Sequence, residues 1–122
     1  MPKKILIVED NESNRQLLHY VLKHRGHEVI EAKDGKEGIE KAEEYMPDLI
    51  FMDLQLPVLD GFTAIKMLKS NPRTKHIKII ALTAFAMNGD KNMIIETGAD
   101  DYIAKPIDTR RMAEIVDKFL GV

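Results

Sequence analysis

Short apolar runs alternate along the chain with longer segments of helical period, and this alternation constrains the fold more than any other feature. Such a pattern is typical of a parallel sheet whose strands are joined by crossover helices. Three of the runs are almost wholly apolar, as strands covered on both faces are. The sequence therefore predicts an α/β fold, with strands at residues 5–8, 28–31, 49–52, 77–82 and 102–104.

Five further segments carry apolar residues at the spacing of helices. The first, around residues 17–22, precedes Gly26, which suits a helix C-terminus. The second is expected to carry Met46 and to stop at Pro47. The fourth covers about residues 90–97. Aspartates are expected to open the second, third and fifth helices: Asp34, Asp60 and Asp108.

The length and composition fit one globular domain. A chain of 122 residues with 44% hydrophobic and 31% charged residues can bury one core, and five strand–helix units fill residues 1–122 without room for an effector domain. Right-handed crossovers would wind these units into a doubly wound, three-layer sandwich. Its ligand site would lie beyond the carboxyl ends of the strands.

Charge and cysteine content exclude several classes of function. A formal net charge of -2 gives no basic footprint for nucleic acid or an anionic membrane. The chain has no cysteine, which excludes disulfides and thiolate chemistry. Its apolar runs are far shorter than the roughly 20 residues of a membrane helix, and it lacks a signal-peptide pattern. We therefore expect a cytoplasmic protein.

Polar side chains follow four of the expected strands, at the point where each strand ends. Glu9 and Asp10 follow the first strand, and Asp53 follows the third. Thr83 and Lys105 follow the fourth and the fifth. Because the carboxyl ends of parallel strands share one edge of a sheet, we expect these residues to converge.

Three carboxylates at one edge would repel one another and raise each other's pKa unless a cation lay among them. Mg²⁺ suits a few carboxylate oxygens, a carbonyl and several waters, and it leaves a position open for a phosphate oxygen. The sequence therefore predicts Mg²⁺ as the cofactor.

Five motifs, in this order and spacing, resemble the receiver family of two-component response regulators. They are Glu9-Asp10-Asn11, residues 52–57 (MDLQLP), Gly61, residues 82–84 (LTA) and residues 105–107 (KPI). The resemblance covers the entire chain. It implies a flavodoxin-like (βα)5 fold with strand order 2-1-3-4-5.

The resemblance also implies a role for each site residue. Asp53 would be the phosphoacceptor, with Thr83 and Lys105 binding phosphoryl oxygens. Thr83 and Tyr102 would form the switch pair. The expected metal ligands are Glu9, Asp10, Asp53 and the backbone carbonyl of Gln55.

Two further features follow from the same resemblance. The Lys105–Pro106 peptide bond would be cis, which proline permits at low cost. Phe85 would lie where the family tunes water access, and an apolar ring there should slow hydrolysis of the acyl phosphate.

The function that the resemblance implies is a phosphorylation switch. The donor would be a sensor histidine kinase or a histidine phosphotransfer protein, and the domain would promote its own phosphorylation and dephosphorylation. A downstream protein would read the surface of the fourth helix, the fifth strand and the fifth helix. Neither direct nucleic-acid binding nor membrane binding is expected.

Three other functions are compatible with parts of this pattern. A haloacid dehalogenase-type phosphatase needs a second aspartate two residues after its nucleophile, where this chain has Gln55. A flavodoxin-like electron carrier needs a phosphate loop rich in Ser, Thr and Gly, whereas residues 8–12 are acidic. A pure interaction module would leave the complete set of site residues without a purpose.

Several residues also have simpler structural roles. Asp10 or Asn11 alone could cap the first helix, and Asp53 alone could be an ordinary strand-end residue. The four histidines lack metal-ligand spacing, so we expect surface positions for them: His19, His24, His27 and His76.

Overall fold

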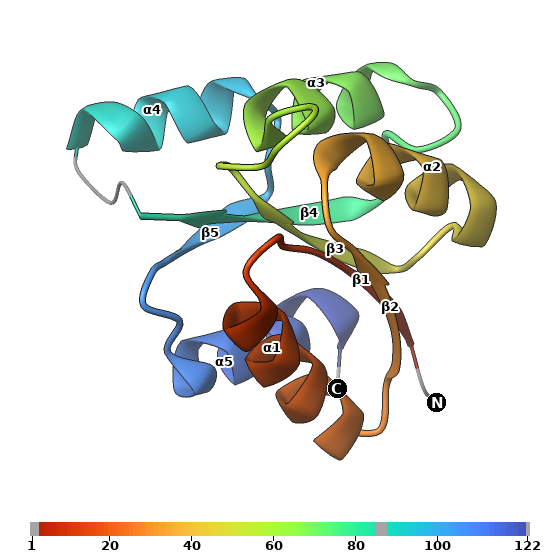
Figure 1. Cartoon of the computed structure of the whole chain (residues 1–122), viewed down its shortest axis with the longest axis vertical. Helices are drawn as coiled ribbons and strands as arrows, with labels where there is room; N and C mark the ends of the chain where they lie inside the picture. The colour runs from red at the N-terminus through yellow and green to blue at the C-terminus, as the bar shows by residue number, and fades with distance from the viewer. Residues whose placement is uncertain (1–2, 85–87, 122) are drawn as a thin grey trace.

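One sheet of five parallel strands forms the centre of the molecule (Figure 1), in the order β2-β1-β3-β4-β5. The computed structural model describes residues 3–84 and 88–121. The predicted α/β class and strand order are confirmed. The strands are β1 (Lys4–Val8), β2 (Glu28–Ala32), β3 (Leu49–Asp53), β4 (Lys78–Thr83) and β5 (Asp101–Ala104).

Helices cover both faces of this sheet (Figure 1). One face carries α1 and α5, and the other carries α2, α3 and α4. This is the doubly wound, three-layer arrangement that the alternating pattern predicted. The helices are α1 (Glu12–His24), α2 (Gly35–Tyr45), α3 (Gly61–Ser70), α4 (Asn88–Glu96) and α5 (Thr109–Leu120).

The apolar runs form strands because successive side chains of a strand point to opposite faces of the sheet. In β3, Ile50 and Met52 pack in the core beneath α2, α3 and α4, whereas Leu49 and Phe51 pack in the core beneath α1 and α5. All four side chains are fully buried. The central strand is therefore held by two cores, and its carboxyl end is fixed in place.

Side-chain caps begin four of the helices. Asn11 accepts a hydrogen bond from the backbone of Asn14 at the start of α1, so Asn11 and not Asp10 is the cap. The three predicted aspartates cap the other helices in the same way: Asp34, Asp60 and Asp108. Hydrogen bonds from the backbone and side chain of Thr63 help to lower the pKa of Asp60, the backbone bond contributing most.

Two expectations from the sequence were wrong in detail. Met46 does not belong to α2; it is the C-cap in the left-handed region, with φ of 48°. The following Pro47 disfavours a helical conformation there. His27 is not on the surface but 4% exposed, and its Nδ1 accepts a hydrogen bond from the backbone of Lys3. Burial lowers the pKa of its imidazole, and the charge of Arg25 adds to this effect.

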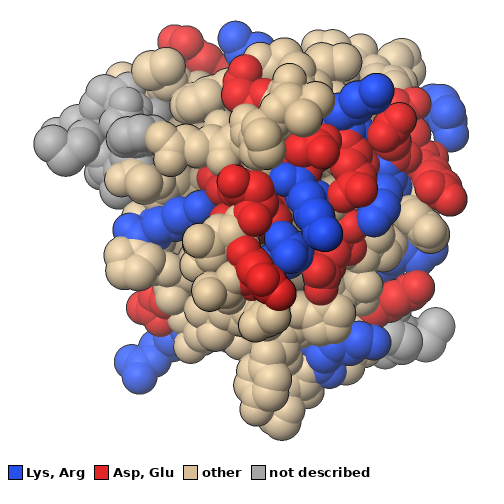
Figure 2. Space-filling view, in the orientation of Figure 1, with Lys and Arg blue, Asp and Glu red and all other residues tan. Residues whose placement is uncertain are grey.

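Charged side chains of both signs lie next to one another over the face shown in Figure 2. This face presents no large area of a single sign, as the net charge of -2 suggests. Within residues 3–84 and 88–121, no helix has both the length and the apolar composition needed to cross a membrane.

Candidate functional site

The carboxyl ends of β1, β3, β4 and β5 bring the predicted polar residues together. Glu9 follows β1 and is fully buried, and Asp53 ends β3 and is 3% exposed. Asp10 is exposed beside them. Carboxylate oxygens of these three residues lie within 4.8 Å of one another. The predicted convergence of the acidic residues is therefore confirmed.

Both oxygens of the Asp53 carboxylate accept hydrogen bonds. Oδ1 accepts one from the backbone N–H of Gln55 at 3.0 Å, and Oδ2 accepts one from Lys105 Nζ at 2.9 Å. The bond from Gln55 comes from the loop that leads to α3, and the bond from Lys105 comes from the end of β5. The carboxylate is thus held in one orientation by groups on two different loops.

The loop after Asp53 turns tightly because α3 begins against the strand end. A Cβ atom at Gly61 would lie 2.0 Å from the backbone oxygen of Asp53, too close for any other residue. The N–H of Gly61 also donates a hydrogen bond to the carbonyl of Leu54 at 3.1 Å. Gly61 therefore lets α3 start close to the site.

Glu9 is held by the first turn of α1. Its Oε1 accepts hydrogen bonds from the backbone of Asn11 at 3.2 Å, from Asn14 Nδ2 at 3.4 Å and from Lys105 Nζ at 3.3 Å. Burial raises the pKa of the Glu9 carboxyl, and the neighbouring Asp53 carboxylate raises it further. Lys105 offsets only part of that increase.

Lys105 is the cation of this cluster. Burial alone would lower its pKa, but the hydrogen bonds and ion pairs with Asp53 and Glu9 outweigh burial and raise it. Lys105 therefore stays charged. Three carboxylates and one ammonium still leave an excess of two negative charges when all four groups are ionised.

The donor set fits a hard divalent cation. Glu9 Oε2 lies 3.2 Å from Lys105 Nζ, yet this buried oxygen makes no hydrogen bond within the described part of the chain. Mg²⁺ binds to carboxylate oxygens that are free to accept a further bond, and excess negative charge favours its binding. Glu9, Asp10 and Asp53 would hold such an ion, which would balance the excess charge.

The remaining predicted residues lie near this cluster or outside the described residues. Thr83 is buried at the end of β4, one residue beyond the partner of Asp53 in the sheet register. The Lys105–Pro106 bond is cis, as expected. Tyr102 is half-buried on β5, the strand next to β4. The expectation for Phe85 falls outside the described residues, and the role of the Gln55 carbonyl stays a prediction.

Asn14 and Arg15 contact the site but were not predicted from the sequence. Asn14 holds the Glu9 side chain, and Arg15 Nη1 donates a hydrogen bond to the Glu9 carbonyl at 2.9 Å. The signal that could have identified Arg15 is its helical spacing with Leu18 and Leu22, since all three are buried on one side of α1. A charged residue on an apolar stripe indicates a buried partner.

Comparisons with known proteins agree with this geometry. The family model described as "Response regulator receiver domain" matches residues 5–117. The chain is 44% identical over 121 residues to the polar-differentiation response regulator DivK of Brucella anthropi, covering 99% of this chain and 98% of that protein.

Two solved structures share the fold. One is the receiver domain of the sensor histidine kinase PA1611 from Pseudomonas aeruginosa, with a magnesium ion coordinated in its active-site cleft; it is 34% identical over all of both chains, with a TM-score of 0.91. The other is the receiver domain of Ssk1 from Saccharomyces cerevisiae in complex with the phosphotransfer protein Ypd1. That match is 31% identical, with a TM-score of 0.91, and covers 97% of this chain and 88% of that chain.

We expect Lys105→Met to destabilise the metal-free protein by about 1 to 3 kcal/mol, because it leaves buried carboxylates without their cation. Saturating Mg²⁺ should restore more stability in this variant than in the wild type, since the metal would take over the neutralising role. Urea unfolding with and without Mg²⁺ measures both effects. Lys118→Met is the control, because Lys118 is exposed near Asp101, away from the cluster. Equal Mg²⁺ stabilisation of wild type and Lys105→Met would contradict this account.

Proposed function

The chain belongs to the response regulator receiver family and has that family's phosphoacceptor role in signalling, and we propose that Asp53 is the residue that takes the phosphoryl group. One observation carries the proposal. Asp53 is a buried carboxylate at the end of the central strand, bonded to Lys105 and within reach of the Glu9 and Asp10 carboxylates. This is a nucleophile beside a fixed cation and a site for a divalent metal.

The proposed reaction transfers a phosphoryl group to a carboxylate oxygen. An Asp53 oxygen forms a bond to phosphorus while the bond from phosphorus to the donor nitrogen or oxygen breaks, and the donor leaves with that electron pair. The Lys105 ammonium, 2.9 Å from Asp53 Oδ2, is placed to bind a phosphoryl oxygen. Thr83, at the end of the adjacent strand, would bind another. Bound Mg²⁺ would supply further charge neutralisation.

The donor that we propose is a sensor histidine kinase or a histidine phosphotransfer protein. The yeast receiver domain with this fold forms a complex with a phosphotransfer protein, which supports a partner of this class. We propose that the domain promotes its own phosphorylation and dephosphorylation with the site residues above. The absence of cysteine is compatible with the cytoplasm, where we propose that this exchange takes place.

Incubation with acetyl phosphate and Mg²⁺ should add one acid-labile phosphoryl group, and Asp53→Asn should abolish it. The reason is that an amide is not a nucleophile toward phosphorus under these conditions. Intact-protein mass measures the labelling, with omission of the divalent cation as one control. Asp60→Asn is the matched variant, because asparagine caps a helix as well as aspartate does and this carboxylate is exposed at the start of α3. Stoichiometric labelling of Asp53→Asn would disprove the assignment.

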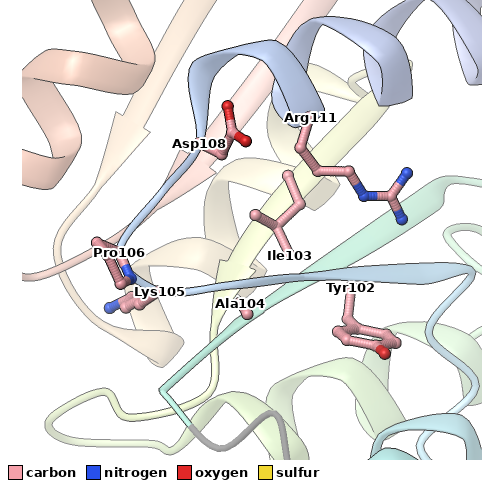
Figure 3. Close-up of a pocket in the computed structure, with 7 residues that line it drawn as sticks. All are labelled: Tyr102, Ile103, Ala104, Lys105, Pro106, Asp108 and Arg111. Atoms are coloured by element: carbon pink, nitrogen blue, oxygen red, sulfur yellow. The ribbon is translucent and has the colours of Figure 1, made fainter.

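We further propose that the output surface consists of α4, β5 and α5. Tyr102 on β5 pairs in register with Ala81 of β4, two residues before Thr83. In Figure 3 the Tyr102 ring points to the opposite side of β5 from Ile103 and Arg111. A surface hollow of ≈ 460 Å³ lies along β5 and the start of α5. Its lining residues are Tyr102, Ile103, Ala104, Lys105, Pro106, Asp108 and Arg111.

The proximity of this hollow to the site supports coupling between the two. Lys105 belongs to both, because its ammonium bonds Asp53 while the residue lines the hollow. Movement of Thr83 toward a phosphoryl oxygen would change the space beside the end of β4 and let Tyr102 move inward. A local charge change would thus bias the shape of the surface that a downstream protein binds.

Thr83→Ala should still accept phosphate but should show a much smaller change around Tyr102 on activation, because it lacks the hydroxyl that would bind the phosphoryl oxygen. Backbone amide shifts with and without a beryllofluoride mimic of the phosphoryl group measure this change. Coupling of roughly 1 to 3 kcal/mol would alter partner affinity by about 5- to 150-fold. Identical shift changes over residues 101–120 in wild type and variant would rule this mechanism out.

A further inference from the structure

A buried arginine holds the loop that carries the acidic pair. Arg15 lies in the first turns of α1 and is 9% exposed. Its Nη1 donates a hydrogen bond to the backbone carbonyl of Glu9 at 2.9 Å and lies 3.5 Å from the carbonyl of Asp10. The guanidinium therefore contacts the peptide groups of both residues and neither of their carboxylates.

The other end of the guanidinium is fixed by the neighbouring edge strand. Arg15 Nε donates a hydrogen bond to Glu31 Oε1 at 3.0 Å, and Glu31 lies on β2. His19 Nδ1 pairs with the second oxygen of Glu31, and Lys41 Nζ donates to the Glu31 carbonyl. Arg15 thus links β2 to the loop between β1 and α1, where the N–H of Glu9 also donates a hydrogen bond to the carbonyl of Ala32 at the end of β2 at 3.1 Å.

Arg15 and Asn14 hold different parts of the acidic pair. Asn14 holds the Glu9 side chain, whereas Arg15 holds the Glu9 main chain. Asp10 is exposed, and Arg15 contacts it at its main-chain carbonyl. The direction of the Asp10 carboxylate therefore depends on how firmly that peptide is held.

We propose that Arg15 is a positioning residue that orients the main chain of Glu9 and Asp10 so that their carboxylates converge with that of Asp53 on a divalent cation. The proposal rests on the proposed metal site. Groups that orient metal ligands without touching the metal typically alter metal affinity by 10- to 100-fold when removed. Arg15 would act through the two acidic residues and not on the phosphoryl group.

Removal of Arg15 should change the Mg²⁺ affinity in opposite directions, depending on whether its charge or its positioning role matters. A positive charge near a cation site repels the incoming ion, so its removal should tighten Mg²⁺ binding if charge alone mattered. Loss of orientation should weaken binding. The sign of the change in Mg²⁺ affinity therefore separates the positioning role from a role in charge balance or general stability.

The test measures the Mg²⁺ dissociation constant of the wild type, Arg15→Met and Arg15→Lys by calorimetric titration, at a temperature where circular dichroism shows each protein folded. We expect about 10-fold weaker binding in Arg15→Met and an intermediate value in Arg15→Lys, which keeps the charge but cannot bridge β2 and the loop. Acetyl phosphate labelling should return close to the wild-type rate at saturating Mg²⁺. Arg25→Met is the control, since Arg25 pairs with Asp117 at the far end of α1 and should leave the dissociation constant unchanged.

Unchanged or tighter Mg²⁺ binding in a folded Arg15→Met protein would overturn the proposal. If Arg15→Met does not fold, wild-type affinity in Arg15→Lys would overturn it equally. A wild type that binds no Mg²⁺ would contradict the metal site itself, and this inference with it. A wild type that binds Mg²⁺ with the same affinity as both Arg15 variants would leave the proposed function standing and remove only the role of Arg15.

Discussion

The charge balance of the site depends on one ammonium group that lies between two buried carboxylates. Lys105 Nζ is 2.9 Å from Asp53 and 3.2 Å from Glu9, and these residues come from the ends of three different strands. Without this cation, burial of the carboxylates beside each other would be costly. Even with this cation, the cluster carries excess negative charge. A divalent metal can therefore bind there, and Lys105 can bind a phosphoryl oxygen. The same imbalance thus underlies both metal binding and the proposed switch.

Elements on both faces of the sheet hold this cluster in place. Two hydrophobic cores fix the central strand that ends in Asp53, while the start of α3 packs on the Asp53 backbone at Gly61. On the other side, Asn14 and Arg15 of α1 hold Glu9 by its side chain and its main chain. Because hydrogen bonds hold the carboxylates of Glu9 and Asp53 close together, their mutual repulsion persists in the folded protein. A bound cation would relieve this repulsion.

The sequence predicted the strands to within a residue or two, because the alternation of apolar runs reports burial directly. It also predicted the convergence of Glu9, Asp53 and Lys105, since parallel strands share one edge for their carboxyl ends. The strand order itself came from the family resemblance, because periodicity says nothing about which strands are neighbours. Arg15 and His27 were missed for a related reason. The helical spacing of Arg15 with Leu18 and Leu22 indicates burial, but no pattern in the sequence identifies the distant partners that make burial of a polar residue possible.

A crystal structure of the protein with Mg²⁺ and beryllofluoride would test most directly whether Asp53, Lys105 and the acidic cluster form one phosphoryl-binding site. We expect beryllium bonded to an Asp53 oxygen, Lys105 Nζ on a fluorine atom, and the metal among Glu9, Asp10 and Asp53 with the Gln55 carbonyl as a ligand. Beryllofluoride on a different carboxylate, or a metal bound away from these residues, would contradict it.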